Sequence, residues 1–119
     1  MRKSCYALAF VMLLVPTFAF AHASLVRSSP SSGAMLAQAP SEIILSFNEA
    51  IEGRFSSVTV TRSDGQKVSS GRVSVDSQKR TDLLVSLPAL RPGRYQVNWR
   101  ATSADSHRIQ GSFSFEVRP

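Results

Sequence analysis

The strongest constraint on the fold is a two-residue alternation of apolar and polar side chains near the carboxyl terminus. Within residues 95–101 every second position is apolar, namely Tyr95, Val97, Trp99 and Ala101. Successive side chains of a strand point to opposite faces of a sheet, so this pattern predicts a strand with one buried and one solvated face. A Pro-Gly turn precedes Tyr95. A tyrosine in this position is typical of the tyrosine corner in immunoglobulin-like sandwiches.

Other short stretches have the same period. They cover residues 43–47, 58–61, 83–87 and 113–117, and Leu25-Val26 could form one more short strand. Asp64-Gly65 is a strong turn signal and predicts a hairpin over residues 57–75. Residues 30–40 and 48–54 have loop composition, with Met35 and Leu36 expected to lean on the core. About seven short strands without a helical segment predict a single all-β domain, an immunoglobulin-like antiparallel β-sandwich.

Aromatic side chains beyond residue 21 mostly follow the predicted buried faces. Five of the six lie at inward strand positions, and Phe55 adjoins one. These rings are therefore expected in the core, which leaves few for a flat binding platform.

The first 21 residues have the three parts of a secretion signal. Arg2 and Lys3 come first, an apolar run covers residues 7–15, and Ala19-Phe20-Ala21 forms a small-x-small cleavage pattern. The apolar run is too short for a membrane span, which needs roughly 20 apolar residues, and Pro16 interrupts it. We expect residues 1–21 to be removed, leaving 22–119 as the domain outside the cytoplasm. The single cysteine, Cys5, would be lost, so no disulfide is expected.

Charge argues against nucleic-acid binding. Loss of Arg2 and Lys3 lowers the formal net charge from +6 to +4, and the remaining basic residues are scattered, with Lys79-Arg80 the longest run. Nucleic-acid binders usually concentrate such charge in a patch with exposed aromatic side chains. Scattered charge in a secreted domain is more typical of solubility.

Both histidines have metal-ligating features. Cleavage after Ala21 would give His22 a free α-amine, and this amine and the ring Nδ1 can chelate one ion. An α-amine has a pKa of about 8 and loses its proton easily when a metal binds. Asp105 and His107 are two residues apart, which in a strand places both side chains on one face. The three residues predict one site.

The ligand set of this site favours copper. Three nitrogens and one carboxylate oxygen suit Cu(II), and Zn(II) is the nearest competitor. A thiolate site for Cu(I) is excluded once Cys5 is lost, and Met35 would be the sole remaining methionine. Each motif alone has a high false-positive rate, and a solvated histidine is its ordinary interpretation.

The sequence resembles the CopC family of periplasmic copper-binding proteins along the whole of residues 22–119. The matching residues are His22-Ala-Ser-Leu, Ser29-Pro30 with Gly33-Ala34, Pro40, Ile44-x-Leu-x-Phe-Asn-Glu49, Phe55-Ser56, Leu90-x-Pro-Gly-x-Tyr-x-Val-x-Trp-Arg100, Ser103-Ala-Asp-Ser-His107 and Gly111-x-Phe-x-Phe-x-Val117. The resemblance implies a Greek-key sandwich or small barrel that binds one Cu(II) through His22, Asp105 and His107. It also implies that Glu49 lies near the metal as an outer ligand; a solvated turn acid is the alternative.

One departure from the family is informative. Some members carry a second, methionine-rich Cu(I) site between middle strands, whereas residues 62–82 contain neither methionine nor histidine. The chain therefore resembles the form of the family with the Cu(II) site alone. The resemblance further implies a periplasmic monomer and a CopD-type inner-membrane protein as a copper-receiving partner.

Three functions remain to be compared. The first is a non-enzymatic Cu(II) carrier for sequestration, resistance or delivery. The second is an oxidative polysaccharide-cleaving enzyme with a copper brace; Asp105 argues against it, because it would occupy a position that oxygen chemistry needs open. The third is an interaction module without metal.

Overall fold

A computed structural model describes residues 9, 11–12, 23–69 and 71–119. In this part the chain forms two four-stranded sheets and one 3₁₀ helix, η1 (Gly53–Phe55). The first sheet has the order β1-β3-β6-β5, with bounds Leu25–Ser29, Glu42–Phe47, Asp82–Ser86 and Ser74–Val75. The second has the order β2-β8-β7-β4, with bounds Met35–Leu36, Arg108–Val117, Gly93–Thr102 and Ser57–Arg62. His22 and most of the expected signal lie outside the described residues.

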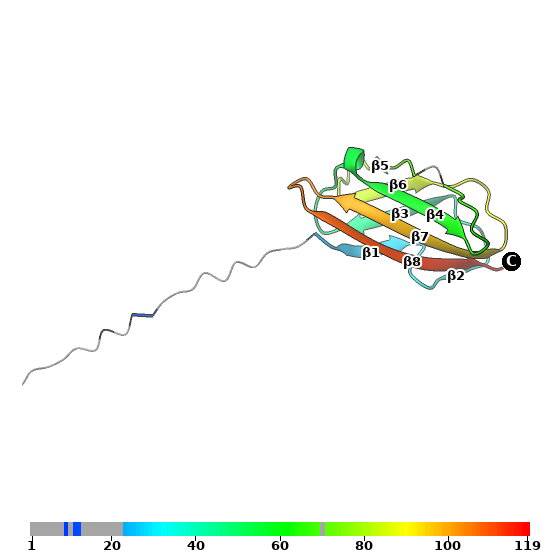
Figure 1. The fold of residues 1–119 in the computed structure, drawn as a ribbon, viewed down its shortest axis with the longest axis horizontal. Helices are drawn as coiled ribbons and strands as arrows, with labels where there is room; N and C mark the ends of the chain where they lie inside the picture. Colours follow the sequence, from blue (N-terminus) through cyan, green and yellow to red (C-terminus); the bar gives the residue numbers. More distant parts are fainter. Residues whose placement is uncertain (1–8, 10, 13–22, 70) are drawn as a thin grey trace, which may run out of the picture.

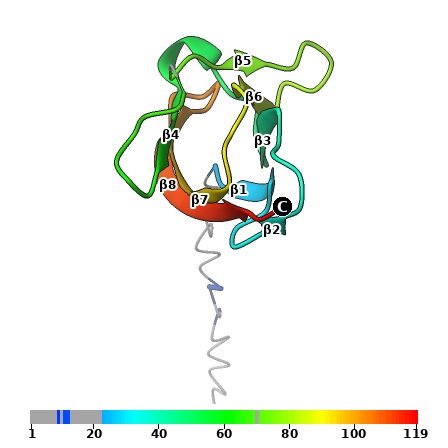
Figure 2. The ribbon, with the colours of Figure 1, turned by 90° about the vertical axis from the view of Figure 1, so that its right-hand side faces the viewer.

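The two sheets pack face to face, and this confirms the predicted all-β sandwich (Figures 1 and 2). The described residues include eight strands instead of about seven, because β2 and β5 have only two residues each. Strands this short leave no alternation in the sequence. All pairs are antiparallel except β2 with β8. No helix among the described residues is long and apolar enough to cross a membrane.

The core lies between the sheets and is built from the predicted inward positions. Tyr95 and Phe115 stack with ring centroids 5.4 Å apart, and Phe47 meets the ring of Trp99 edge-on at 5.4 Å. The Tyr95 hydroxyl donates a 2.6 Å hydrogen bond to the carbonyl oxygen of Arg91. This contact confirms the tyrosine corner, which ties the loop before β7 to the core.

The hairpin expected over residues 57–75 forms only at its turn. Beyond the turn, Lys67 makes one bridge to Thr61, and the hydroxyl of Ser69 accepts a 2.8 Å hydrogen bond from the backbone N–H of Val60. Farther along, the chain no longer pairs with β4, and β5 instead pairs with β6 in the opposite sheet. A serine side chain thus takes the place of a ladder bond at the edge of β4, so the predicted second strand does not continue.

Two apolar side chains are more exposed than the core assignment predicts. Met35 is 67% exposed, and only its neighbour Leu36 packs against the core. Phe55 lies in η1 and is 62% exposed, unlike the five other aromatic residues of the sandwich, which are buried.

Candidate metal centre

Asp105 and His107 lie in the loop that joins β7 to β8. β7 ends at Thr102 and β8 begins at Arg108, so the expectation that both residues belong to a strand is wrong. Ser106 has a φ of 72°, a left-handed conformation that cannot continue a strand. The loop is closed by backbone hydrogen bonds from Ser103 N–H to the carbonyl of His107 at 2.8 Å and from Ser106 N–H to the carbonyl of Ser103 at 2.9 Å.

Ser103 organises this loop from a buried position. It is 1% exposed, its hydroxyl donates a hydrogen bond to the Asp105 carboxylate, and the same oxygen accepts the N–H of His107 at 3.1 Å. Ser103 belongs to the sequence motif that contains Asp105 and His107, but no role is predicted for it from the sequence. The available signal was its place two residues before an aspartate, where serine hydroxyls commonly bond to local groups.

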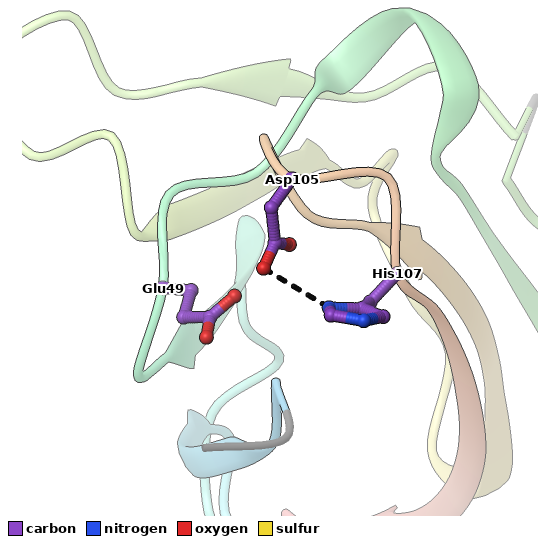
Figure 3. A group of neighbouring side chains, drawn as sticks. All are labelled: Glu49, Asp105 and His107. Carbon is purple, nitrogen blue, oxygen red and sulfur yellow. Dashed lines mark hydrogen bonds and ion pairs between the residues drawn. The ribbon is translucent and has the colours of Figure 1, made fainter. Parts of the chain in front are cut away.

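The Asp105 carboxylate is held between two partners. One oxygen accepts the Ser103 hydroxyl, and the other, Oδ2, lies 3.0 Å from Nδ1 of His107 (Figure 3). The Ser103 hydrogen bond, followed by the charge and hydrogen bond of His107, holds the pKa of Asp105 below its ordinary value, although partial desolvation opposes this. The carboxylate is therefore ionised at neutral pH. Its side chain is 53% exposed and that of His107 is 54% exposed, so an ion can reach both from solvent.

Glu49 joins these two residues from the segment that follows β3. Two backbone contacts join this segment to the β7–β8 loop. The N–H of Ala104 donates to the carbonyl of Ala50 at 2.9 Å, and Ile51 forms an antiparallel β-bridge with Ser103. One ligand atom each of Glu49, Asp105 and His107 lies within 4.8 Å of the others. Figure 3 shows the Glu49 carboxylate facing the Asp105–His107 pair. We name these three residues the acidic-histidine cluster.

The beginning of the described sandwich is fastened beside this cluster. The N–H of Ser24 donates to Oδ1 of Asn48 at 2.7 Å, and the N–H of Asn48 donates to the carbonyl of Ser24 at 3.1 Å. Ala23 is 4% exposed. Glu49 therefore lies between two anchors, one to the segment after residue 22 and one to the β7–β8 loop. His22 itself lies outside the described residues, so the structure brings together three of the four predicted site residues.

The cluster offers donors for a divalent ion. Two carboxylates and an imidazole provide oxygen and nitrogen ligands, which suit Cu(II) and Zn(II). Nδ1 of His107 faces Asp105, which leaves Nε2 as the ring nitrogen facing away from this carboxylate. A carboxylate bonded to one ring nitrogen commonly fixes the orientation of a metal-ligating histidine. The arrangement can hold a metal ion at an exposed end of the sandwich.

Comparison with known proteins shows which family the chain resembles in sequence and fold. The model of the CopC domain matches residues 25–118. Protein YobA of Escherichia coli strain K12 is 33% identical over 98% of this chain and 96% of its own length. Copper resistance protein C of Pseudomonas syringae pv. tomato is 35% identical over 98% of this chain and 97% of its own length.

A solved structure agrees with these sequence matches. The crystal structure of CopC from Methylosinus trichosporium OB3b superimposes with a TM-score of 0.78 and 32% sequence identity, covering 82% of this chain and 95% of that protein. The shared fold and the sequence matches extend over the whole sandwich, including the β7–β8 loop. The chain therefore belongs to the CopC family.

Proposed function

We propose that the chain, cleaved after Ala21, binds one Cu(II) ion through the α-amine and imidazole of His22 and the side chains of Asp105 and His107. Glu49 acts as an outer ligand. The observation that carries this proposal is the acidic-histidine cluster, whose ligand atoms lie within 4.8 Å of one another beside the anchored segment that follows residue 22.

Covalent geometry supports a contribution from His22. Ser24 is fixed to Asn48 by two hydrogen bonds, and Asn48 immediately precedes Glu49. Two residues of extended chain span at most about 7 Å, so the amino terminus of the cleaved protein starts within that distance of Ser24. Its α-amine and ring can reach an ion held by the cluster, and they would add the nitrogens that Cu(II) prefers over oxygen ligands alone.

The ligand chemistry supports Cu(II) as the single bound ion. Cu(II) stands at the top of the divalent affinity series for nitrogen and oxygen sites. Among the described residues after Met12, Met35 is the sole methionine, and it lies on β2, outside the cluster. A separate thioether site for Cu(I) therefore has no ligand set in the sandwich.

The physiological role that fits these features is copper handling in the periplasm. The cluster is exposed, so it can capture Cu(II), shield the cell from it and pass it on to a CopD-type inner-membrane protein. We propose that the protein acts as a monomer. The chain is not an enzyme: it belongs to the CopC family, and where the name of a relative states a role, that role is copper resistance or copper transport.

The test is copper titration of protein that begins at His22. We expect one Cu(II) per chain by calorimetry and mass spectrometry, with nitrogen hyperfine couplings in the electron paramagnetic resonance spectrum. Two matched controls isolate the amino terminus. His22→Ala removes the imidazole, and a chain with one extra alanine before His22 retains the imidazole but converts the α-amine into an amide. Both should lose affinity. If the extended chain and the parent bound copper equally well, the amine would have no part in the site.

The same samples address the competing interpretations. Amino-terminal sequencing of the exported protein should begin at His22, and periplasmic extracts should contain it. A titration with Zn(II) should give a weaker complex than Cu(II). Protein that bound neither metal at neutral pH would leave an interaction module as the better description.

A further inference from the structure

Phe55 lies on the surface in η1. This helix is bonded to the end of β7, from which the β7–β8 loop with Asp105 and His107 begins. The ring of Phe55 is 62% exposed and lies beneath the guanidinium of Arg54, whose Cζ is 5.3 Å from the ring centroid. Single exposed apolar residues are common and need no explanation. Phe55 differs because its backbone is fixed and because basic side chains surround it.

Three hydrogen bonds attach the segment around η1 to Thr102 at the end of β7, and a fourth closes that segment on itself. Thr102 Oγ1 donates to the carbonyl of Phe55 at 3.1 Å, and Thr102 N–H donates to the Ser56 hydroxyl oxygen at 3.0 Å. The Ser56 hydroxyl donates to the carbonyl of Glu52 at 2.8 Å, and Glu52 N–H donates to the carbonyl of Thr102 at 2.8 Å. Thr102 directly precedes Ser103, which orients Asp105. The exposed ring is therefore fixed relative to the acidic-histidine cluster.

A hollow of about 370 Å³ lies between Phe55 and the first residues of β8. Its lining includes Phe55, Arg100, Arg108 and Ile109, and Ile109 also packs against the core. No aspartate or glutamate lines it among the described residues. Within the same part of the chain, Arg54, Arg100 and Arg108 form no ion pair. We name Phe55, Arg54, Arg100, Arg108 and Ile109 the aromatic-arginine surface.

We propose that the aromatic-arginine surface docks an acidic peptide segment, carrying one apolar side chain, of the protein that receives copper from the neighbouring site. The copper transfer rests on the proposed function, whereas the docking does not. Protein interfaces are enriched in aromatic residues and arginine, and the anchors of binding energy are often residues of these types. The apolar side chain would enter the hollow, and the carboxylates would meet the three unpaired guanidinium groups. A surface this small fits a weak, transient contact, as hand-over of an ion requires.

The first test needs no copper. The probe is a short acetylated peptide in which one leucine is flanked on both sides by glutamates, added to ¹⁵N-labelled protein. We expect amide shifts confined to residues 53–56, 100–102 and 108–110, with weaker binding at high salt. The double variant Phe55→Ala with Arg100→Gln should reduce binding several-fold. The matched control is Met35→Ala with Arg94→Gln, which removes an exposed apolar residue and an arginine near a different, smaller hollow and should leave binding unchanged.

The second test measures transfer. The copper-loaded protein is mixed with an acceptor peptide that begins Gly-Gly-His and ends in the same glutamate-leucine segment, or in a lysine-leucine segment as its control. We expect faster transfer to the acidic acceptor. This advantage should disappear in Phe55→Ala with Arg100→Gln, which leaves copper affinity unchanged because neither residue belongs to the cluster.

The outcomes separate the two proposals. Peptide shifts at the aromatic-arginine surface without copper binding would support docking and overturn the proposed function. Copper binding without such shifts at millimolar peptide would overturn the docking surface alone. Binding of phosphatidylglycerol vesicles that requires Phe55 and Arg100, with no effect of the acidic peptide, would assign the surface to a membrane and also overturn the proposal. Self-association that depends on these two residues would do the same.

Discussion

The buried hydroxyl of Ser103 donates a hydrogen bond to the exposed carboxylate of Asp105. This contact adds a side-chain hydrogen bond to the backbone hydrogen bonds that already hold the β7–β8 loop. Asp105 in turn faces Nδ1 of His107, so one serine determines the orientation of both side chains. The side chains of the proposed metal site are thus oriented without an ion, and preorganisation of this kind reduces the cost of ordering ligands on binding.

Ser103→Ala should raise the pKa of Asp105 toward its ordinary value of about 3.9, because the hydroxyl is the largest cause of the depression. Carboxyl ¹³C shifts followed by NMR against pH in the metal-free protein measure this directly. Ser112→Ala, an exposed serine on β8, is the matched control and should leave the titration unchanged. A titration of Asp105 that stays the same in Ser103→Ala would show that the hydroxyl does not stabilise the carboxylate.

The same contact gives the pH dependence of stability a definite sign. The folded-state pKa of Asp105 lies below the unfolded one, so its contribution to stability is present above the unfolded value and lost as pH falls through the folded value. The melting temperature of the parent should therefore exceed that of Ser103→Ala at neutral pH, and part of this difference should disappear well below about pH 3.9. A difference that grew on acidification would contradict the assignment.

Substitutions within the acidic-histidine cluster should rank the roles of its members. Glu49→Gln should weaken Cu(II) binding by about 10–100-fold, the usual effect of changing a group that supports the ligands. Asp105→Asn and His107→Ala should weaken it further, because each removes a proposed ligand that also orients the other one. Calorimetric titration of the three variants provides the comparison. Equal losses for Glu49→Gln and His107→Ala would show that Glu49 binds the ion directly.

Sequence periodicity located the strands that have one fully buried face. In residues 95–101 of β7 and 113–117 of β8, every second side chain is apolar and buried because the opposite sheet covers that face. The pairing of β4 with β7 could not be predicted from this alternation. The register that joins it to β7 depends on residues some forty positions away, and a serine side chain replaces its expected hairpin partner.

The proposed metal site likewise depends partly on local sequence and partly on contacts between distant segments. Residue chemistry alone pointed to Asp105 and His107, but the strand geometry used to bring them together is replaced by a loop with Ser106 in a left-handed conformation. The approach of Glu49 depends on the contact between Ala50 and Ala104, which involves backbone atoms and leaves no trace in side-chain type. Only resemblance to a family could place Glu49 there.

Tyr95→Phe should destabilise the sandwich by about 0.5–1.5 kcal/mol, the usual net contribution of one hydrogen bond. The hydroxyl bonds to the carbonyl of Arg91 at 2.6 Å, and the residue is 1% exposed. Its ring should stay stacked on Phe115, so near-ultraviolet circular dichroism should be preserved while the urea midpoint falls. An unchanged midpoint would mean that the corner contact contributes nothing to folding.

Gly111→Ala should destabilise the protein by about 1–3 kcal/mol, the typical cost of overpacking a core. Gly111 lies opposite Trp99 in the β7–β8 ladder, and a Cβ atom there would be 2.6 Å from Cζ2 and 2.8 Å from Cε2 of the indole. The indole is 7% exposed and lies against Phe47, so it has little room to move away. Trp99 is the single tryptophan of the chain, so its fluorescence follows urea unfolding without interference. Ser112→Ala, at the next position of the same strand, controls for a general effect on β8 and should leave the midpoint nearly unchanged. A Gly111→Ala variant as stable as the parent would show that the indole can shift within the core, contrary to the close packing of this ladder.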